Sequence, residues 1–393
     1  MLRGGARSIL PGVKVVVALD KFKGSLTASR ACEIVRNAIH STQPGVTIVV
    51  KPMADGGDGT ADVLRAALGG EWVQHKVTGP LPRTLVSARY LWLPQERLAV
   101  VEMAQASGLV LLKPEQRNPL RTHSHGAGEL LCYAASQGAQ RILLAVGGSA
   151  TIDGGVGAAR AGGWRFVGAN GKQVELGGGE LERIVKIEDP KSDPELNEED
   201  FLNSSVEVLC DVNNPLCGEH GAARVFGPQK GATPEMVEQL DAGLRHLAEL
   251  VKTQLGKDIA DVPGAGAAGG LAFGALAFMD AKLLPGVEAV AETIGLDAAL
   301  RGADWVITGE GRFDEQSLQG KVVSGITKRA GKYGVKVAVI AGSVQIPEDA
   351  WRREGIELAL STMDPGMELD KAMASAEKLL AFAARHLAAR ILI

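Results

Sequence analysis

The chain has 393 residues and a formal net charge of −4; hydrophobic residues make up 46% of it and aromatic residues only 4%. This length favours two domains over one. The small net charge and the scattered lysines and arginines exclude the basic footprint of a nucleic-acid-binding protein and the polybasic segment of a membrane-surface protein.

The first part of the chain predicts the start of a parallel α/β fold. Residues 15–19 are a continuous apolar run, long enough for a fully buried strand. Apolar residues then recur with helical spacing over 28–39, with Ser25 or Thr27 as the N-cap. A second buried strand is expected at 46–53, before a glycine-rich turn and another helix. This alternation is typical of parallel sheets with crossover helices.

The same rhythm returns only near the end of the chain. Residues 305–308, 335–341 and 358–361 have the composition of strands, and a final helix is expected at about 369–391. Two early strands and three late ones give the strand count of a flavodoxin-like doubly wound sheet. The chain therefore predicts a sheet assembled from its two ends.

The middle of the chain differs from both ends. Residues 71–93 predict short antiparallel strands, and long helices are expected at 126–137 and 234–255. The fold class that follows is α/β, a flavodoxin-like doubly wound parallel sheet domain with an inserted mixed α/β domain. We expect the first domain to be discontinuous, 1–75 with 285–393, and the inserted domain to span 76–284.

The cysteines and the apolar stretches indicate a cytoplasmic protein. The four cysteines have neither a CxxC nor a zinc-ligand spacing, so buried free thiols in a reducing compartment are expected. They are Cys32, Cys132, Cys210 and Cys217. Segment 1–11 lacks the apolar core of a signal peptide. Residues 262–279 carry no charge but consist largely of Gly and Ala, which favours a buried helix over a membrane span.

A glycine-rich loop follows the strand expected at 142–146. It begins with Gly147 and Gly148 and continues through Ser149 to Asp153. Successive glycines let backbone N–H groups converge on an anion, and the Ser149 hydroxyl adds a donor. The alternative is a plain tight turn without a ligand.

A second glycine-rich segment, 264–269, matches the pattern G-x-G-x-x-G of dinucleotide-binding proteins. That fingerprint requires a strand directly before it and an acidic residue about twenty positions later, and position 284 is Leu. A nicotinamide-dependent hydroxy-acid dehydrogenase is therefore a weak alternative, and close backbone packing or approach to a nucleotide stays open. The sequence contains neither a Walker A motif nor a G-x-S-x-G elbow.

Charged and hydroxyl residues gather where a doubly wound sheet places its active site, beyond the carboxyl ends of the strands at the point where strand order reverses. In a flavodoxin-like order the loops after the first and third strands face each other there. The first loop contains Asp20, Lys23 and Ser25; the second contains Glu310, Arg312, Asp314, Gln316 and Ser317, with Lys321 shortly after. Carboxylates for Mg²⁺, cations for phosphate and hydroxyls for a small polyol are the groups that phosphoryl transfer needs.

Eight segments of the chain resemble the type-1 glycerate kinase family, in family order and over nearly the whole length. The segments are Asp20-Lys-Phe-Lys-Gly-Ser-Leu-Thr, Pro52-Met-Ala-Asp-Gly-Gly-Asp-Gly-Thr, Glu102-Met-Ala-Gln-Ala-Ser-Gly-Leu, Gly147-Gly-Ser-Ala-Thr-Ile-Asp-Gly-Gly, Asp211-Val-Asn-Asn-Pro-Leu, Phe226-Gly-Pro-Gln-Lys-Gly-Ala, Gly264-Ala-Gly-Ala-Ala-Gly-Gly and Thr308-Gly-Glu-Gly-Arg-Phe-Asp-Glu-Gln-Ser with Gly320-Lys321. Departures are small: loop 191–200 is longer than expected, His125 stands where an aromatic residue is expected, and Asn213-Asn214 replaces an Asp-Asn pair.

The resemblance implies ATP with Mg²⁺ as cofactors and D-glycerate as the substrate, phosphorylated at its 2-hydroxyl. Phosphorylation at the 3-position and a non-catalytic nucleotide-binding regulator are the other readings, and a homo-oligomer is left open. The residues expected to carry catalysis are Asp20, Lys23, Asp153 and Asp314, and the choice of general base among the three aspartates stays open. Phosphate or substrate binding is expected at Ser25, Gly147, Gly148, Ser149, Arg312, Gln316, Ser317 and Lys321. Metal binding is expected at Glu310 and Asp314.

Overall fold

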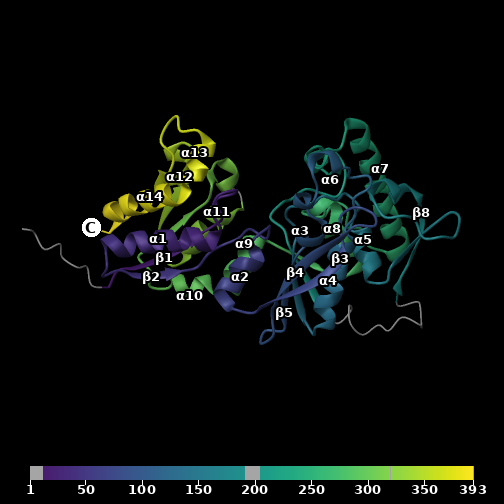
Figure 1. Ribbon diagram of the computed structural model, residues 1–393, viewed down its shortest axis with the longest axis horizontal. Helices are drawn as coiled ribbons and strands as arrows, with labels where there is room; N and C mark the ends of the chain where they lie inside the picture. The colour runs from purple at the N-terminus through teal and green to yellow at the C-terminus, as the bar shows by residue number, and fades with distance from the viewer. Residues whose placement is uncertain (1–11, 191–203, 319, 393) are drawn as a thin grey trace, which may run out of the picture. The chain divides into compact units, whose positions relative to one another are not determined.

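The computed structural model describes residues 12–190, 204–318 and 320–392, so segment 1–11 and loop 191–200 lie outside the described residues. The chain divides into two compact units, which are described separately (Figure 1). Unit 1 consists of Met1–Asp55, Asp62–Ala67 and Val287–Ile393, and unit 2 of Gly56–Ala61 and Leu68–Gly286. The domain boundaries expected from the sequence, at 75/76 and 284/285, stay a prediction.

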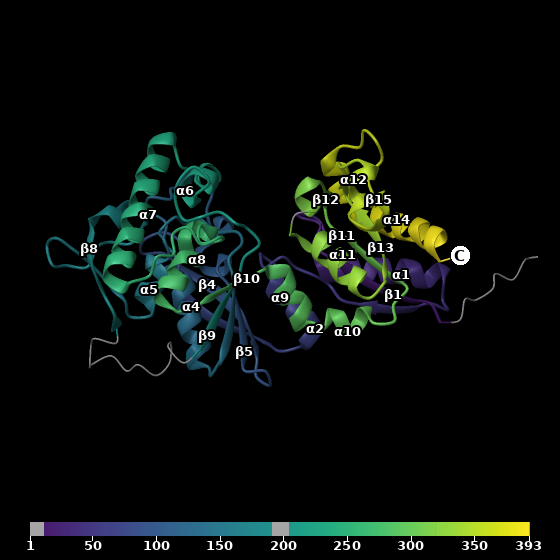
Figure 2. The same cartoon turned by 180° about the vertical axis from the view of Figure 1, so that it is seen from behind.

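Unit 1 is built on a five-stranded parallel sheet in the order β15-β13-β11-β1-β2. Its strands are β1 (Lys14–Leu19), β2 (Thr47–Val50), β11 (Trp305–Gly309), β13 (Lys336–Ala341) and β15 (Ile356–Ser361). Counted within the unit, this order is 2-1-3-4-5, that of a flavodoxin-like sheet. Figure 2 shows β11, β13 and β15 from the C-terminal part of the chain beside β1 from its beginning. The predicted fold class is confirmed.

Helices cover both faces of the unit 1 sheet. Alternate strand residues, among them Val17, Ile307 and Ile340, belong to a core shared with α1 (Ala28–Thr42) and α14 (Ala376–Ile391). Because successive strand residues point to opposite faces, Val16, Val306 and Val339 face away from this core. Helix α11 (Val322–Lys332) contacts β11 and β13 and contributes buried residues of its own. Both faces of the central strands are therefore buried, which explains their unbroken apolar runs.

Two expectations for unit 1 are corrected. The second strand was expected to be buried over 46–53, but β2 has four residues and most of it is only half-buried. It lies at the edge of the sheet and pairs with β1. The final helix is divided into α13 (Leu369–Ala374) and α14, because the backbone leaves helical geometry at Ser375.

The other elements of the first and last parts of the chain are short. They are α2 (Thr60–Leu68), α9 (Gly286–Thr293), α10 (Leu296–Leu300), β12 (Arg312–Phe313), η6 (Glu315–Leu318), β14 (Ser343–Val344) and α12 (Glu348–Arg353). Strands β12 and β14 form a two-stranded parallel pair.

Unit 2 contains a mixed six-stranded sheet in the order β10-β9-β6-β5-β4-β3. Its strands are β3 (Glu71–Thr78), β4 (Leu85–Leu93), β5 (Leu98–Glu102), β6 (Arg141–Ala145), β9 (Ser205–Leu209) and β10 (Lys282–Leu284). The first three are antiparallel neighbours, as expected for 71–93, and the others are parallel. A separate antiparallel pair is formed by β7 (Arg165–Gly168) and β8 (Ile184–Glu188).

The helices of unit 2 enclose one large apolar core. They are α3 (Ala104–Ser107), α4 (His125–Ser136), α5 (Val156–Ala161), α6 (Ala222–Phe226), α7 (Pro234–Leu255) and α8 (Ala267–Phe278), with 3-10 helices η1 (Leu109–Leu111), η2 (Pro114–Gln116), η3 (Gly178–Arg183) and η5 (Pro228–Lys230). Helix α8 is buried along almost all of its length, as expected for the Gly/Ala-rich stretch. Among the described residues, no helix has both the length and the apolar character needed to cross a bilayer.

Candidate active site

Asp20 directly follows β1 at the carboxyl end of the unit 1 sheet, and only 7% of it is exposed. Its Oδ1 accepts a hydrogen bond of 2.7 Å from the backbone N–H of Lys21. Burial, followed by the nearby carboxylate of Asp55, raises the pKa of Asp20 to about 7; Lys21 opposes this shift and Glu310 adds to it. A carboxyl with this pKa can accept and release a proton near neutral pH.

The loops after β1 and β11 adjoin, as the predicted strand order requires. The N–H of Asp20 donates a hydrogen bond of 2.9 Å to the carbonyl oxygen of Gly309. A Cβ placed on Gly311 would lie 3.3 Å from the backbone nitrogen of Lys23, so the two backbones pass very close to each other. The expected proximity of these two loops, nearly three hundred residues apart in sequence, is confirmed.

Lys23 and Ser25 lie in a tight turn before α1. Ser25 donates to the carbonyl oxygen of Phe22 twice, from its N–H at 2.8 Å and from its Oγ at 3.0 Å. Of the two expected N-caps, Thr27 caps the helix, since its Oγ1 accepts a hydrogen bond from the N–H of Arg30. The side chain of Lys23 is exposed, so its ammonium group is accessible from solvent.

Glu310 directly follows β11. Its Oε1 is buried and has no hydrogen-bond partner among the described residues. Burial is the largest influence on the pKa of Glu310 and raises it, although Ser317 and Lys321 act in the opposite direction. A buried carboxylate oxygen without a donor fits a hard cation such as Mg²⁺, which proteins bind through one or two carboxylates. In the described part of the chain, no three or more His, Cys, Asp or Glu side chains form a metal-binding cluster.

Asp314 organises the rest of this loop. Its Oδ1 accepts a hydrogen bond of 3.0 Å from the N–H of Gln316, and its Oδ2 pairs with Arg312 Nε at 2.9 Å. The N–H of Asp314 donates to Ser317 Oγ at 3.1 Å, and Lys321 Nζ donates to Gln316 Oε1 at 3.2 Å. The structure thus brings together five residues expected at the site, and it uses Asp314 as the cap of η6.

In unit 2, the glycine pair of the loop after β6 is packed against another loop. A Cβ on Gly147 would lie 2.6 Å from Gly57 Cα, and a Cβ on Gly148 would lie 2.7 Å from Asp58 Oδ1. Gly148 also has a backbone φ of +71°, a value that residues other than glycine rarely adopt. Close approach and backbone geometry therefore account for both glycines without a ligand, and phosphate binding by them stays a proposal.

Asp153, in the same loop, is buried and its oxygens are occupied. Oδ2 accepts hydrogen bonds from the N–H and Oγ of Ser124, both at 2.8 Å, and from the N–H of Gly157 at 3.1 Å. Oδ1 accepts from the N–H of Gly155 at 3.3 Å. A carboxylate engaged by four donors holds its loop in place.

Two functional candidates were missed from the sequence. Lys230, at the end of η5, is buried and donates hydrogen bonds to Ser149 Oγ at 2.7 Å and to the carbonyl oxygen of Thr151 at 2.8 Å. Glu102 at the end of β5 accepts the N–H groups of Gly59 and Ala61, at 2.9 and 3.0 Å, at the start of α2. Both residues lie in segments that resemble the glycerate kinase family. The spacing of residues around them does not indicate which distant loop each one contacts.

The G-x-G-x-x-G segment has the surroundings of a packing motif. Turns, not a strand, precede it. A Cβ on Gly266 would overlap the carbonyl oxygen of Pro215, and one on Gly269 would overlap that of Thr151. Close backbone packing is therefore observed at this segment, and turns stand where a dinucleotide fingerprint requires a strand.

Comparison with known proteins agrees with these features. The model of the glycerate kinase family matches residues 15–392. A glycerate kinase from Halalkalibacterium halodurans is 45% identical over 374 residues, which cover 95% of this chain and 97% of that protein. A glycerate 2-kinase from Escherichia coli K12 is 40% identical over 381 residues, 97% of this chain and 98% of the relative.

A solved structure from Salmonella typhimurium LT2 that carries the name glycerate kinase 2 superposes with a TM-score of 0.84. It is 39% identical, and the match covers 96% of this chain and 98% of the solved one. Both the sequence and the fold thus match over nearly the full length. The chain belongs to the glycerate kinase family of enzymes.

Proposed function

We propose that this enzyme transfers the γ-phosphoryl group of ATP to the 2-hydroxyl of D-glycerate, forming 2-phosphoglycerate. Family membership supports a kinase that acts on glycerate, and the name of the Escherichia coli relative supports the 2-position. The observation that carries the proposal is Asp20, a buried carboxyl with a pKa of about 7 beside the β11 loop. It is suited to take the proton of an attacking hydroxyl near neutral pH.

Among the three aspartates that could serve as the general base, the contacts favour Asp20. The oxygens of Asp153 accept four hydrogen bonds, and those of Asp314 are engaged by a helix cap and an arginine. We therefore assign proton acceptance to Asp20 and loop positioning to Asp153. Asp314 is given a shared role, in which it caps η6 and contributes negative charge to the site.

In this proposal, cations of unit 1 bind the negatively charged phosphate groups of ATP. Lys23 is exposed in the turn before α1, and Arg312 is exposed on the loop after β11. Lys321 reaches the same loop through Gln316. Ser25, Gln316 and Ser317 supply polar groups. Gly147, Gly148 and Ser149, in unit 2, remain proposed substrate- or phosphate-binding residues. Since phosphoryl transfer depends mainly on positioning and charge neutralisation, these groups suffice without a covalent intermediate.

Glu310 and Asp314 would hold Mg²⁺, and the buried Oε1 of Glu310 without a donor is the feature that fits the ion. The bound ion would neutralise charge on the phosphate oxygens. The residues of the chain keep their own roles: Glu310 supplies an oxygen, and Asp314 keeps the loop in its capped conformation.

The position of the phosphate is tested by a coupled assay. The enzyme is incubated with ATP and D-glycerate and coupled directly to enolase, which consumes 2-phosphoglycerate. We expect turnover without added phosphoglycerate mutase. If a signal appears only after mutase is supplied, the product is 3-phosphoglycerate and the 2-position is wrong.

A further inference from the structure

Lys230 is a buried cation beneath the Ser149–Thr151 turn of unit 2, and only 2% of it is exposed. Both of its hydrogen bonds, to Ser149 Oγ and to the Thr151 carbonyl oxygen, go to neutral acceptors. Within the described ranges, no carboxylate oxygen forms an ion pair with its ammonium group. Asp153 is the acidic group that acts on Lys230, but only at a distance, and its oxygens are taken up by the backbone and by Ser124.

A buried ammonium group without an adjacent counter-ion is costly, because it has lost its hydration. Burial accordingly lowers the pKa of Lys230 to about 7, and Asp153 only partly opposes the shift. An ammonium group has three N–H donors and the hydrogen bonds to Ser149 and Thr151 use two of them, so one donor is left for a further acceptor. An anion in contact with this donor would supply the missing charge.

The segments around the same turn contain further buried polar atoms without partners. Among the described residues these include Ser107 Oγ, both ring nitrogens of His123, and Thr151 Oγ1. Their segments adjoin the turn, since the carbonyl oxygen of Ser107 accepts the N–H of Ala150 at 2.9 Å. Burial lowers the pKa of His123, so its neutral ring can donate one hydrogen bond and accept another. Because buried polar groups normally have partners, such a concentration of unmet ones points to a ligand or to water.

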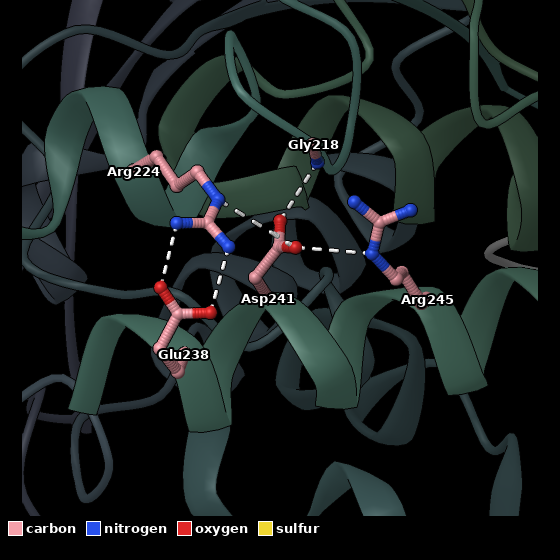
Figure 3. Close-up of polar contacts among 5 residues, drawn as sticks. All are labelled: Gly218, Arg224, Glu238, Asp241 and Arg245. Carbon is pink, nitrogen blue, oxygen red and sulfur yellow. Dashed lines mark hydrogen bonds and ion pairs between the residues drawn. The ribbon is translucent and has the colours of Figure 1, made fainter. Parts of the chain in front are cut away.

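The position of Lys230 is fixed by its neighbours in the chain. It lies between α6 and α7, which are tied together by the ion pairs shown in Figure 3. Arg224 of α6 forms two hydrogen bonds, of 2.6 and 2.7 Å, with Glu238 of α7. The buried Asp241 accepts the N–H of Gly218 at 2.8 Å and Arg245 Nε at 3.0 Å. This network holds the segment that carries Lys230 and therefore presents a preorganised cation to the turn.

We propose that Lys230 and the Ser149–Thr151 turn bind the carboxylate of the hydroxy-acid substrate. This assignment rests on the proposed function and names its acceptor-recognition site. One buried ammonium group balances one carboxylate charge, whereas a triphosphate would require several cations. Ser149 is 9% exposed, more than Lys230, Thr151 or His123, so it is the place where a ligand from solvent meets the turn.

The test is equilibrium binding by calorimetry, with D-glycerate, glycerol and ATP as ligands. Glycerol has the hydroxyl groups of glycerate but lacks the carboxylate, so its weak binding should not change in the variants. We expect Lys230→Met to raise the Kd of D-glycerate about tenfold or more, as for loss of a hydrogen bond to a charged group. The Kd of ATP should stay within about twofold, and Lys230→Arg should recover part of the glycerate affinity because it restores the charge.

Lys257→Met is the matched control. Lys257 also belongs to unit 2 and donates to a backbone carbonyl, that of Ala277 at 2.7 Å, but its charge is paired with Asp280. It should leave the Kd of D-glycerate unchanged. An unchanged Kd in folded Lys230→Met, a loss confined to ATP, or an equal loss in Lys257→Met overturns the proposal.

If Lys230→Met does not fold, the pH dependence of binding carries the test. It is measured in Asp20→Asn, because Asp20 also titrates near pH 7. The Kd of D-glycerate should rise with pH above about 7, because neutral Lys230 no longer attracts the carboxylate. The other two groups near Lys230 do not account for such a rise: burial keeps His123 uncharged, and Asp153 is held by hydrogen bonds. A flat profile contradicts the proposal.

The enolase-coupled assay on the wild-type enzyme distinguishes failure of the proposed function from failure of this site. Absent turnover refutes the proposed function, whereas turnover with unchanged glycerate binding in Lys230→Met refutes only this site.

Discussion

The N–H of Asp20 donates a hydrogen bond of 2.9 Å to the carbonyl oxygen of Gly309, residues 289 positions apart in the chain. This bond continues the parallel pairing of β1 with β11 by one step beyond the strands. It brings the Asp20 carboxyl to the loop that carries Glu310. Burial and the Asp55 carboxylate raise the pKa of Asp20 most, and the Glu310 carboxylate adds to the shift. The proposed catalytic chemistry therefore depends directly on strand order.

Asp20→Asn should reduce turnover by about two orders of magnitude or more, because loss of a positioned general base has that effect. In the wild-type enzyme, kcat at saturating D-glycerate should rise with pH through about 7 as Asp20 loses its proton, because saturation removes the effect of pH on substrate binding. The pH–rate profile of both proteins checks this. If Asp20→Asn turns over at the wild-type rate and its rate rises with pH in the same way, another group must be responsible for that rise.

The same residue predicts a change in stability with pH. The pKa of Asp20 is raised in the folded state, from 3.8 to about 7, so the folded protein holds this proton more tightly than the unfolded chain. Its contribution to stability is fully present below about pH 4 and is lost as the pH rises through 7. Asp20→Asn should therefore melt at a higher temperature than the wild type at pH 8, and the difference should shrink toward pH 4. Thermal unfolding at both pH values measures this, and equal melting temperatures at pH 8 would contradict it.

Lys23→Ala should cut turnover by about two orders of magnitude while leaving the melting temperature unchanged, because the side chain is exposed and its proposed partner is the phosphate of ATP. Lys378→Ala is the control, an exposed lysine of the same unit on α14. Near-normal turnover in folded Lys23→Ala would show that Lys23 is an ordinary exposed surface residue without a role in catalysis.

The sequence predicted those parts of the fold and site that depend on local pattern. Apolar runs located the central strands, because strands buried on both faces consist almost entirely of apolar residues. The strand count then predicted that the Asp20 and Glu310 loops lie together, since a flavodoxin-like order makes their strands neighbours. Edge strand β2 was expected to be too long and too buried, because an apolar run cannot reveal that a strand has a neighbour on one side only.

The contacts of single side chains could not be predicted in this way. Asp153 has the residue type of a general base, but four donors occupy its oxygens. Lys230 stands 81 residues from Ser149 with no spacing to connect them, and its burial depends on how α6 and α7 pack. Residue type thus indicated the chemistry available, whereas the assignment of roles required the tertiary structure.

A reducing agent should leave the melting temperature unchanged, because all four cysteines are free thiols. The expectation of buried thiols holds for Cys32, whose pKa burial raises to about 12, while Cys132, Cys210 and Cys217 are only half-buried. Alkylation of the native protein should therefore spare Cys32 longest. A clear fall in melting temperature with reductant would show that a disulfide contributes to stability.

The last prediction separates metal binding by Glu310 and Asp314 from loop capping. Asp314→Asn keeps the Oδ1 that accepts the N–H of Gln316, and Asn caps helices as well as Asp does. It removes the negative charge that pairs with Arg312, and any charge offered to Mg²⁺. If Asp314 only caps η6, turnover and its Mg²⁺ dependence should stay near wild type. If it also serves the metal, turnover should collapse and half-maximal activity should require more Mg²⁺, with the fold retained.

Glu310→Gln provides the second arm of this experiment, since the Glu310 Oε1 has no donor among the described residues and a capping role does not compete. Its loss of charge should raise the Mg²⁺ requirement even if Asp314→Asn does not. Asp349→Asn is the control, because Asp349 also pairs with an arginine, Arg353 at 2.9 Å, but lies on the exposed helix α12. Magnesium titrations of turnover in the three variants decide the matter. Unchanged curves and normal rates in both Asp314→Asn and Glu310→Gln would remove the metal assignment. The fold and the Asp20 proposal would remain, because burial and Asp55 raise the pKa of Asp20 more than Glu310 does.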